Sequence, residues 1–397
     1  MTRSPMVLAN ITTGVDLMTT PKQIQTPSEK PIRLLDEFSG SIGDLGTFLP
    51  YVLAVITVAG LNSTSVFVGF GLFYVLSGWF YTIPMAVQPM KAAAAAVLVH
   101  QLTIPEIAAA GFIMGAVLLI LGLTGVINQL ARLTPPGVTG GIQVGLGLSL
   151  ALMGLKMVHT DPLLGWVILA GMLVLLTSRR FPASIFALVV GTGLAFVLHP
   201  ELSLPSLSWG LQMPELILPK TADFQRGFLM LVLPQLPLTL TNAVLVTAAL
   251  SAELYGPRAA RVTEKNLSLS MGLANLLVAP WGGFMMCHGS GGVAAHYRFG
   301  GRTRLTPFII GFALVLLGLC LGNDGVKLLQ LIPEAVLGAL LFYSGVDLAS
   351  AARGIDQRKD VFLVLVVAAL TLAINPAIAF VVGLIVAKGL KLNIVKI

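Results

Sequence analysis

The sequence predicts an all-α, polytopic membrane protein of about fourteen transmembrane segments, arranged as two inverted repeats of seven. Composition is the first observation: 56% of the 397 residues are hydrophobic and only 10% are charged, whereas about a quarter of the residues of a soluble domain are charged. The second is that the apolar residues gather in runs suited to helical crossings of about 20 residues. The third is an internal repeat with a spacing of 198 residues.

The polar start of the chain and its apolar runs define the segments. Residues 1–37 are polar, mixed in charge and without a run long enough for a signal peptide, so we expect a short cytoplasmic tail. The first repeat, 38–198, has segments expected near 38–60, 64–82, 88–100, 105–127, 136–156, 162–178 and 182–198. After an external connector, 199–225, the second repeat, 226–397, has segments expected near 226–252, 265–280, 288–299, 304–321, 328–349, 359–373 and 376–394.

The third and tenth segments, 88–100 and 288–299, are too short to cross a bilayer as single helices. Both lie in stretches rich in proline or glycine, IPMAVQPMK in the first repeat and APWGGFMMCHGSGG in the second. We expect these two segments to be half-helices that meet near the midplane of the membrane.

The distribution of Lys and Arg predicts the orientation. With the N-terminus inside, 19 of the 24 basic residues fall in the tail or in loops on the same side, as expected of cytoplasmic loops. Both termini are therefore predicted to be cytoplasmic, in a multi-pass protein of the cell membrane. The same bias accounts for the net charge of +7, so the lipid bilayer and not nucleic acid is the expected partner. Two cysteines in apolar stretches predict neither a disulfide framework nor a metal cluster, and no cofactor is expected.

The two halves resemble each other in sequence. LTPPGVTGGIQVGLGLSLA (Leu133–Ala151) aligns without gaps with LIPEAVLGALLFYSGVDLA (Leu331–Ala349). The same offset carries the stretch Ile83–Val97 to within a few residues of Ala279–His296. Because seven is odd, the second half enters the membrane from the opposite side. Such inverted repeats are typical of secondary transporters, whose sites lie near the midplane where the repeats meet.

The two interrupted segments predict an anion site. Non-helical backbone at membrane depth is tolerated only where protein buries it or where it lines a wet cavity. Related by the repeat, the half-helices bring two N-termini together, each with unpaired N–H groups and about half a positive charge. Lys91, in the first turn of the third segment, adds a full positive charge. The helix dipole disfavours a lysine there, which indicates that the substrate is an anion.

Three motifs carry a family resemblance. GDLGTFLP (Gly43–Pro50), VQPMKA (Val87–Ala92) and HGSGGVAAHYRFGGRT (His288–Thr303) resemble the molybdate transporter family, which is allied to the sulfate permease (SulP) superfamily. The resemblance covers nearly the whole chain from Phe38 on. It implies a fold like that of sulfate and uracil permeases, and molybdate or sulfate as substrate. It also implies two bundles: a core bundle of residues 38–128 plus 226–322, and a gate bundle of residues 129–198 plus 323–397.

Two differences separate the sequence from typical sulfate permeases. Those proteins continue into a soluble regulatory STAS domain after the last helix, whereas this sequence ends at Ile397. They also tend to carry a serine–arginine pair where Gly291-Gly292-Val293 stands here. Both differences favour the molybdate branch and remove that arginine as an anion ligand.

The expected substrate-binding donors come from both repeats. Gln88, just before the third segment, can donate two N–H bonds to an oxyanion. The backbone amides of Gly289 and Gly291 and the hydroxyl of Ser290 offer donors at the tenth segment. Asn242, in the eighth segment, either donates to the oxyanion or binds a neighbouring helix.

Ionisable side chains complete the candidate site. Asp44 is an intramembrane carboxylate, a residue type that by default suggests a function. It is either a proton-coupling group or a partner for Lys91; the alternative is a structural hydrogen bond to the broken backbone. Lys91 is expected to bind the anion. His288 either belongs to the site or packs, whereas His296 is expected to pack.

We therefore expect a secondary active transporter, not an enzyme, that imports an oxyanion. The expected oxyanion is molybdate, coupled to protons and carried by alternating access. The alternatives are a sulfate/proton symporter with the same site and a passive anion channel. A remote alternative is an intramembrane serine hydrolase, because Ser290 lies near His288, but residues at i and i+2 do not face each other on a helix. Whether the protein is a homodimer is left open.

Overall fold

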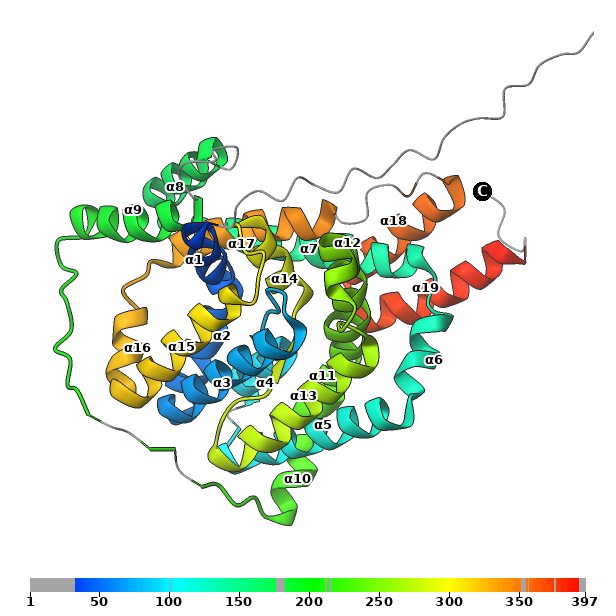
Figure 1. The fold of residues 1–397 in the computed structure, drawn as a ribbon, viewed down its shortest axis with the longest axis horizontal. Coiled ribbons are helices and arrows are strands. Elements are labelled where there is room, and N and C mark those ends of the chain that lie inside the picture. Colours follow the sequence, from blue (N-terminus) through cyan, green and yellow to red (C-terminus); the bar gives the residue numbers. More distant parts are fainter. Residues whose placement is uncertain are drawn as a thin grey trace, which may run out of the picture. The chain divides into compact units, whose positions relative to one another are not determined.

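Helices make up most of the computed structural model, which describes residues 33–100, 102–175, 183–210, 213–214, 216–350, 355, 357–374 and 376–392 (Figure 1). The elements of the first repeat are α1 (Leu34–Gly43), α2 (Leu45–Ala59), α3 (Ser63–Tyr81), β1 (Gln88–Pro89), α4 (Lys91–His100), α5 (Ile104–Thr124), α6 (Val126–Leu133), α7 (Pro136–Val158), α8 (Pro162–Leu175) and α9 (Ala183–Leu198).

The second repeat follows the same plan, with more irregular helix. Its elements are α10 (Thr221–Gly227), η1 (Phe228–Val232), α11 (Leu233–Leu238), η2 (Thr239–Val246), α12 (Thr247–Tyr255), η3 (Gly256–Ala259), α13 (Glu264–Val278), η4 (Ala279–Trp281), β2 (Met286–Cys287), α14 (Ser290–Arg298), α15 (Leu305–Cys320), α16 (Asn323–Leu329), α17 (Glu334–Ser350), α18 (Arg358–Ala373) and α19 (Pro376–Lys391). Each of the fourteen predicted segments therefore contains a helix or a broken helix.

Length and hydropathy identify the helices best suited to cross a membrane. Among the described residues, α3, α5 and α7 are each long and apolar enough, and two bent pairs raise this number to five. The pairs are α1 with α2, bent by 46°, and α16 with α17, bent by 72°. The shorter apolar helices include α8, α9 and α15.

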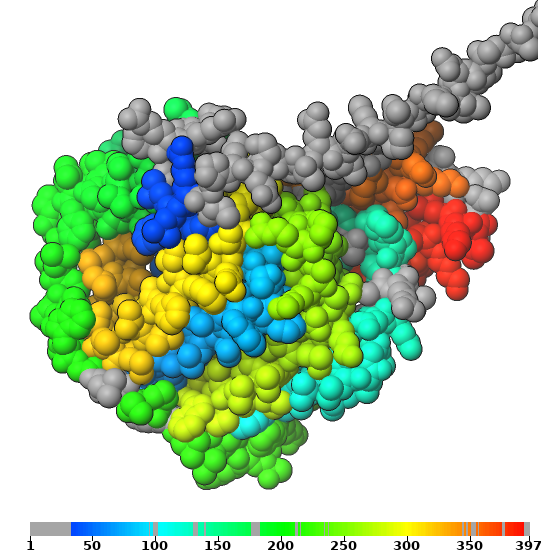
Figure 2. Space-filling view, in the orientation of Figure 1, coloured from blue at the N-terminus to red at the C-terminus, as the bar shows by residue number. Residues whose placement is uncertain are grey.

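The packing of the helices has the symmetry of an inverted repeat. At the offset found in the sequence, α7 (from Pro136) corresponds to α17 (from Glu334), and these two helices pack on each other. In the same way α3 corresponds to α13 and α5 to α15. α3 packs on α15, and their equivalents α13 and α5 also pack on each other. The two helix pairs are therefore related by the repeat. Figure 2 shows the result on one face, where blue first-repeat surface lies between yellow and yellow-green surface of the second.

Glycines bring α7 and α17 together at this symmetry axis. A Cβ on Gly345 would lie 2.5 Å from the backbone nitrogen of Ala151, and one on Gly147 would overlap the backbone nitrogen of Ala349. Small residues let helix backbones approach closely in membrane proteins. Gly147 and Gly345 are also repeat equivalents, so their contact lies near the pseudo-two-fold axis.

The helices assigned to the two bundles pack mainly within their own set. In the gate bundle α7 contacts α17 and α18, and α8 contacts α9, whereas the core bundle is built on the two pairs named above. Between the sets, α17 contacts α2 and α14. The division into a core that moves against a gate stays a prediction.

The first helix begins earlier than predicted. It starts at Leu34, so the last residues of the predicted tail, 1–37, belong to α1, while 1–32 lie outside the described residues. Glu37 is buried there. Its carboxylate accepts hydrogen bonds from Arg302 N (3.1 Å), Thr303 N (3.3 Å) and Thr306 Oγ1 (2.6 Å). A carboxylate with such partners can be buried, which a hydropathy pattern does not reveal.

Two equivalent segments, the first and the eighth, are irregular at equivalent positions. The first breaks at Asp44, between α1 and α2. The eighth runs without a break from Thr221 to Tyr255 but contains two π-helical stretches, and Asn242 lies in the second of them, η2. Prolines inside α11 remove backbone donors, a recognised cause of irregular helix. Asp44 and Asn242 are separated by the repeat offset, so both repeats distort the same place.

Candidate functional site

Two short strands hold the repeats together at the centre of the fold. β1 and β2 pair antiparallel, with Gln88 opposite Cys287 and Pro89 opposite Met286. The repeat offset carries Gln88 to Met286 and Pro89 to Cys287, so the pairing maps onto itself. The half-helices follow directly: α4 begins at Lys91 and α14 begins at Ser290. The predicted meeting of two helix N-termini is therefore present.

Two amide side chains that the sequence analysis missed brace this centre. Asn275 in α13 forms two hydrogen bonds with the backbone of Met286: Nδ2 donates to its carbonyl oxygen at 2.8 Å and Oδ1 accepts from its N–H at 3.0 Å. Gln235 in α11 accepts a hydrogen bond from Ala93 N at 3.1 Å, which caps the first turn of α4. An intramembrane amide at each position was the available signal, because such residues often bind neighbouring helices.

Asp44 is bound to Gln88 and Thr47. The Nε2 group of Gln88 donates to both carboxylate oxygens of Asp44, at 2.7 and 2.9 Å, and also contacts the hydroxyl of Thr47. That hydroxyl donates to the Asp44 carboxylate in turn. All three residues are buried. Among the described residues Asp44 makes no ion pair with Lys91, so the pairing considered from the sequence is not a direct one in this conformation. Thr47 was not among the expected residues.

The other end of the Gln88 amide faces the N-terminus of α14. Its Oε1 atom is buried and has no hydrogen-bond partner in the described part of the chain. A Cβ on Gly289 would overlap this oxygen, and one on Gly292 would lie 2.6 Å from Gln88 Nε2. An added side chain at Gly289 would therefore displace the Gln88 amide, and one at Gly292 would also meet Asp44 and Ala86. Gly291 instead adjoins Leu150 of α7.

The second repeat contributes a pair of its own. Ser290 Oγ donates to Asn242 Oδ1, so the amide oxygen is occupied and the amide nitrogen has no partner among the described residues. Thr247 supports the pair from α12, because its hydroxyl bonds to the carbonyl oxygens of Asn242 (2.9 Å) and His288 (3.3 Å).

Both histidines of this region are used inside the protein. His288 Nδ1 lies 2.9 Å from the Ala86 carbonyl oxygen and its Nε2 lies 2.9 Å from Ser270 Oγ. Its ring also packs against Phe73 and Tyr81. His296 binds the carbonyl oxygen of Gly40 through Nδ1, at 2.8 Å. Ser290 bonds to Asn242 and not to His288, so the Ser290–His288 pair considered from the sequence is not formed; the serine beside His288 is Ser270.

A small cavity lies where the repeats meet. Its lining comes from both halves: Gln88, Pro89, Lys91, Gln235, Leu238, Thr239, Asn242, Ala243 and Cys287. Lys91, which is half-buried, is the only charged side chain among the described residues of that lining. The volume is about 10 Å³, which is space for about one water molecule.

Comparison of the sequence with known proteins identifies the family to which the chain is similar. The family described as "Molybdate transporter of MFS superfamily" matches residues 36–150 and 227–348, one stretch in each repeat. Two proteins of Arabidopsis thaliana, Molybdate transporter 1 and Molybdate transporter 2, are each 30% identical to this chain. The first alignment covers 88% of this chain and 86% of the relative, and the second covers 91% and 88%.

Solved structures share the fold. The transmembrane domain of the cyanobacterial bicarbonate transporter BicA has a TM-score of 0.59 and 20% identity, over 88% of this chain and 97% of that one. Murine solute carrier 26 family member A9, an anion transporter, has a TM-score of 0.60 and 13% identity, over 93% and 70%. These similarities confirm the predicted all-α, polytopic membrane fold. Because the alignments at 30% identity cover 88% and 91% of its length, the chain belongs to the molybdate transporter family.

Proposed function

We propose that this chain is a secondary active transporter that imports molybdate together with protons by alternating access. The observation that carries the proposal is the cavity between the repeats. Both repeats contribute to its lining, and Lys91 is the only charged side chain among the described lining residues. An ammonium withdrawn from bulk water without a carboxylate partner is costly unless an anion accompanies it. The relatives from A. thaliana are named molybdate transporters, which supports molybdate as that anion.

The proposed ligands are divided between the repeats. Lys91 supplies the positive charge, while the backbone amides of Gly289 and Gly291 supply donors at the start of α14. The hydroxyl of Ser290 donates to Asn242 Oδ1 and so orients the Asn242 amide. Asn242 adds its amide nitrogen, because its oxygen is already bound by Ser290. An oxyanion accepts hydrogen bonds and donates none at neutral pH, so these donors suit it. Lys91 and Asn242 line the cavity, whereas Gly289 and Gly291 do not. We assign His288 to packing, since both of its ring nitrogens have protein partners.

The small size of the cavity supports an alternating mechanism. Space for one water cannot hold a tetrahedral dianion. Binding therefore requires the elements that line the cavity to move apart. Access from one side at a time follows if the two repeats separate in alternation.

Gln88 is the proposed link between the proton and the anion. With Asp44 ionised, the Gln88 amide donates to the carboxylate and turns its oxygen toward Gly289, where an acceptor would repel an anion. A proton on Asp44 makes that carboxyl a donor, so the amide can turn over and bind it through Oε1. The turned amide then presents its N–H groups to the anion.

This arrangement makes the two binding events favour each other. By thermodynamic linkage, protonation of Asp44 raises the affinity for the anion by the same factor by which the anion raises the affinity for the proton. Among the described residues, the other ionisable groups that interact with Asp44 include His296 of α14, Lys91 of α4, Tyr74 of α3 and Cys287 of β2. These groups set the electrostatic potential at the Asp44 carboxylate, and a bound dianion would change that potential.

Purified protein in proteoliposomes tests the proposal. We expect an inward proton gradient to drive uptake of radioactive molybdate above equilibrium, with unlabelled molybdate competing better than sulfate, and sulfate better than chloride. Sulfate competing better than molybdate would replace the substrate by sulfate at the same site. Uptake that never exceeds equilibrium would indicate a passive channel.

A further inference from the structure

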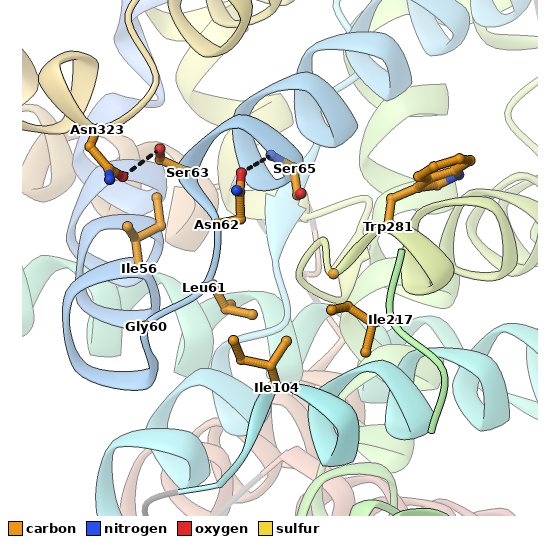
Figure 3. Close-up of a pocket in the computed structure, with 11 residues that line it drawn as sticks. Ile56, Gly60, Leu61, Asn62, Ser63, Ser65, Ile104, Ile217, Trp281 and Asn323 are labelled. Carbon is orange, nitrogen blue, oxygen red and sulfur yellow. Dashed lines mark hydrogen bonds between the residues drawn. The ribbon is translucent and has the colours of Figure 1, made fainter. Parts of the chain in front are cut away.

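A second and larger cavity opens at the far end of α3 from the site described above. Its volume is about 350 Å³. It lies where four connections meet, beside Ile217 of the external connector: the α2–α3 turn, the start of α5, the η4 turn and the start of α16 (Figure 3). The distribution of Lys and Arg predicts that all four connections face the outside of the cell. None of the described residues that line the cavity is charged.

Two asparagines present donors to this cavity. Asn62 Oδ1 accepts the backbone N–H of Ser65 at 3.0 Å, and Asn323 Oδ1 accepts the hydroxyl of Ser63 at 2.8 Å, as Figure 3 shows. Since each amide oxygen is occupied, each amide turns its NH₂ group away from that bond. Neither nitrogen has a partner in the described part of the chain. Each asparagine therefore has its NH₂ group left to donate to a ligand.

Ser65 gives an independent indication of a ligand. Its side chain lines the cavity and is only 3% exposed, yet its hydroxyl has no partner among the described residues. An unsatisfied buried hydroxyl is uncommon and costs free energy. It lies in the first turn of α3, a 19-residue helix whose N-terminus attracts negative charge.

We propose that this cavity is an outer docking site for a tetrahedral oxyanion, bound by the side-chain donors of Asn62, Ser65 and Asn323. The two amide NH₂ groups and the Ser65 hydroxyl can all donate to an anion, which accepts hydrogen bonds and has none to donate. With no lysine or arginine among the described lining residues, the site is weak, so the anion can pass on to Lys91. That the docked ion is the transported one rests on the proposed function; the docking itself does not.

Aspartate substitutions test the site without disturbing the fold. Asn62→Asp keeps the oxygen that caps α3 but replaces the NH₂ donor by a negatively charged acceptor, and Asn323→Asp does the same for the bond from Ser63. We expect each to raise the KM for molybdate uptake from the outer side by about tenfold or more, with KM from the inner side unchanged. Ser65→Ala is expected to raise the outer KM by a smaller factor without lowering the melting temperature. Ser206→Asp, at an exposed position in the external connector and outside the cavity lining, is the control for charge alone.

A second readout does not depend on transport. Trp281 lines the cavity, so a variant with Trp79, Trp166 and Trp209 replaced by Phe reports on it alone. We expect molybdate added outside sealed proteoliposomes to change this emission saturably. Asn62→Asp should shift the midpoint by about tenfold or more, whereas Ser290→Ala should not. An unchanged emission, or KM effects equal on both sides, overturns the docking site. A saturable change without any uptake supports docking and refutes the proposed function.

Discussion

The two repeats have the same backbone plan at the centre of the molecule but different chemistry. Asp44 in the first repeat corresponds to Asn242 in the second, and Lys91 corresponds to Gly289, each at an offset of 198 residues. The strands pair symmetrically, yet ionisable groups lie only on the first-repeat side of these equivalent pairs. The comparison indicates that the two repeats share a symmetric backbone. At the equivalent positions the first repeat has the ionisable side chains Asp44 and Lys91, whereas the second has the neutral residues Asn242 and Gly289.

The largest expected effect comes from adding a side chain at Gly289. Gly289→Ala places a methyl group on Gln88 Oε1, so either α14 or the amide must move, and we expect transport to be abolished. Overpacking of this kind typically costs about 1–3 kcal/mol. Uptake by the purified variant measures the effect, and Gly193→Ala, where an added Cβ meets no atom within 4 Å, is the matched control.

A double variant separates the clash from other causes. If Gln88 is the group that the methyl meets, Gln88→Ala should restore the melting temperature lost in Gly289→Ala. Normal transport by Gly289→Ala alone would show that Gln88 does not fill this space during the cycle.

The next effect concerns the proton. Asn at position 44 cannot ionise but can donate an N–H bond to Gln88 Oε1, as a protonated carboxyl would. We therefore expect Asp44→Asn to bind molybdate with an affinity close to wild type and independent of pH, and to lose accumulation driven by a proton gradient. Binding from pH 5 to 8 and uptake under a gradient measure the two halves of this prediction.

The equivalent position in the second repeat provides the contrast. Asn242→Asp places a carboxylate beside Ser290 and should weaken anion binding near neutral pH, because like charges repel. Should Asp44→Asn still concentrate molybdate under a gradient, coupling does not depend on Asp44 and the asymmetry of the repeats has another meaning.

A smaller effect is expected at the second-repeat pair. Ser290→Ala removes the hydroxyl that binds Asn242 Oδ1 and thereby keeps the Asn242 amide nitrogen available to the anion. The loss of that one hydrogen bond to a charged ligand corresponds to about 1.5–3 kcal/mol of binding free energy. Ser268→Ala is the control, since it removes another buried serine hydroxyl, bonded to Leu118 O at 2.7 Å, outside the site. Equal affinities of both variants for molybdate, measured by calorimetry, would exclude Ser290 from the site.

The sequence predicted the frame better than the contacts. Apolar runs, the repeat offset and the broken segments were enough to place Gln88, Ser290 and the two half-helices, because each depends on local patterns. The partner of Asp44 was not predictable: Lys91 is the obvious opposite charge, but the structure places Gln88 and Thr47 around it. Such choices depend on which side chains the packing of distant helices brings within hydrogen-bond distance.

Buried polar residues away from the motifs were missed for the same reason. Glu37 looks like part of a polar tail, and its burial depends on donors some 265 residues later in the chain. Asn275 and Gln235 brace β2 and α4, but nothing local distinguishes them from amides that bind any neighbouring helix.

The smallest effect is expected at a pair that the second repeat lacks altogether. His199 Nε2 lies 2.8 Å from Asp161 Oδ2 at the ends of α9 and α8, whereas the equivalent positions of the second repeat are Ile397 and Lys359. The hydrogen bond to Asp161 raises the pKa of His199, and the same bond lowers the pKa of Asp161. A raised histidine pKa stabilises the fold below the unfolded value of about 6.5 and is lost as pH rises; a lowered aspartate pKa stabilises above about 3.9 and is lost as pH falls. The contribution of the pair is therefore largest between those two values.

We expect the melting temperature of His199→Gln to fall slightly below wild type near pH 5.5 and to converge with it toward pH 9. The difference should be small because the pair is exposed to solvent and screened. A difference that grew with pH would contradict this assignment, and transport should be unaffected at every pH, since the pair lies outside the centre where the repeats meet.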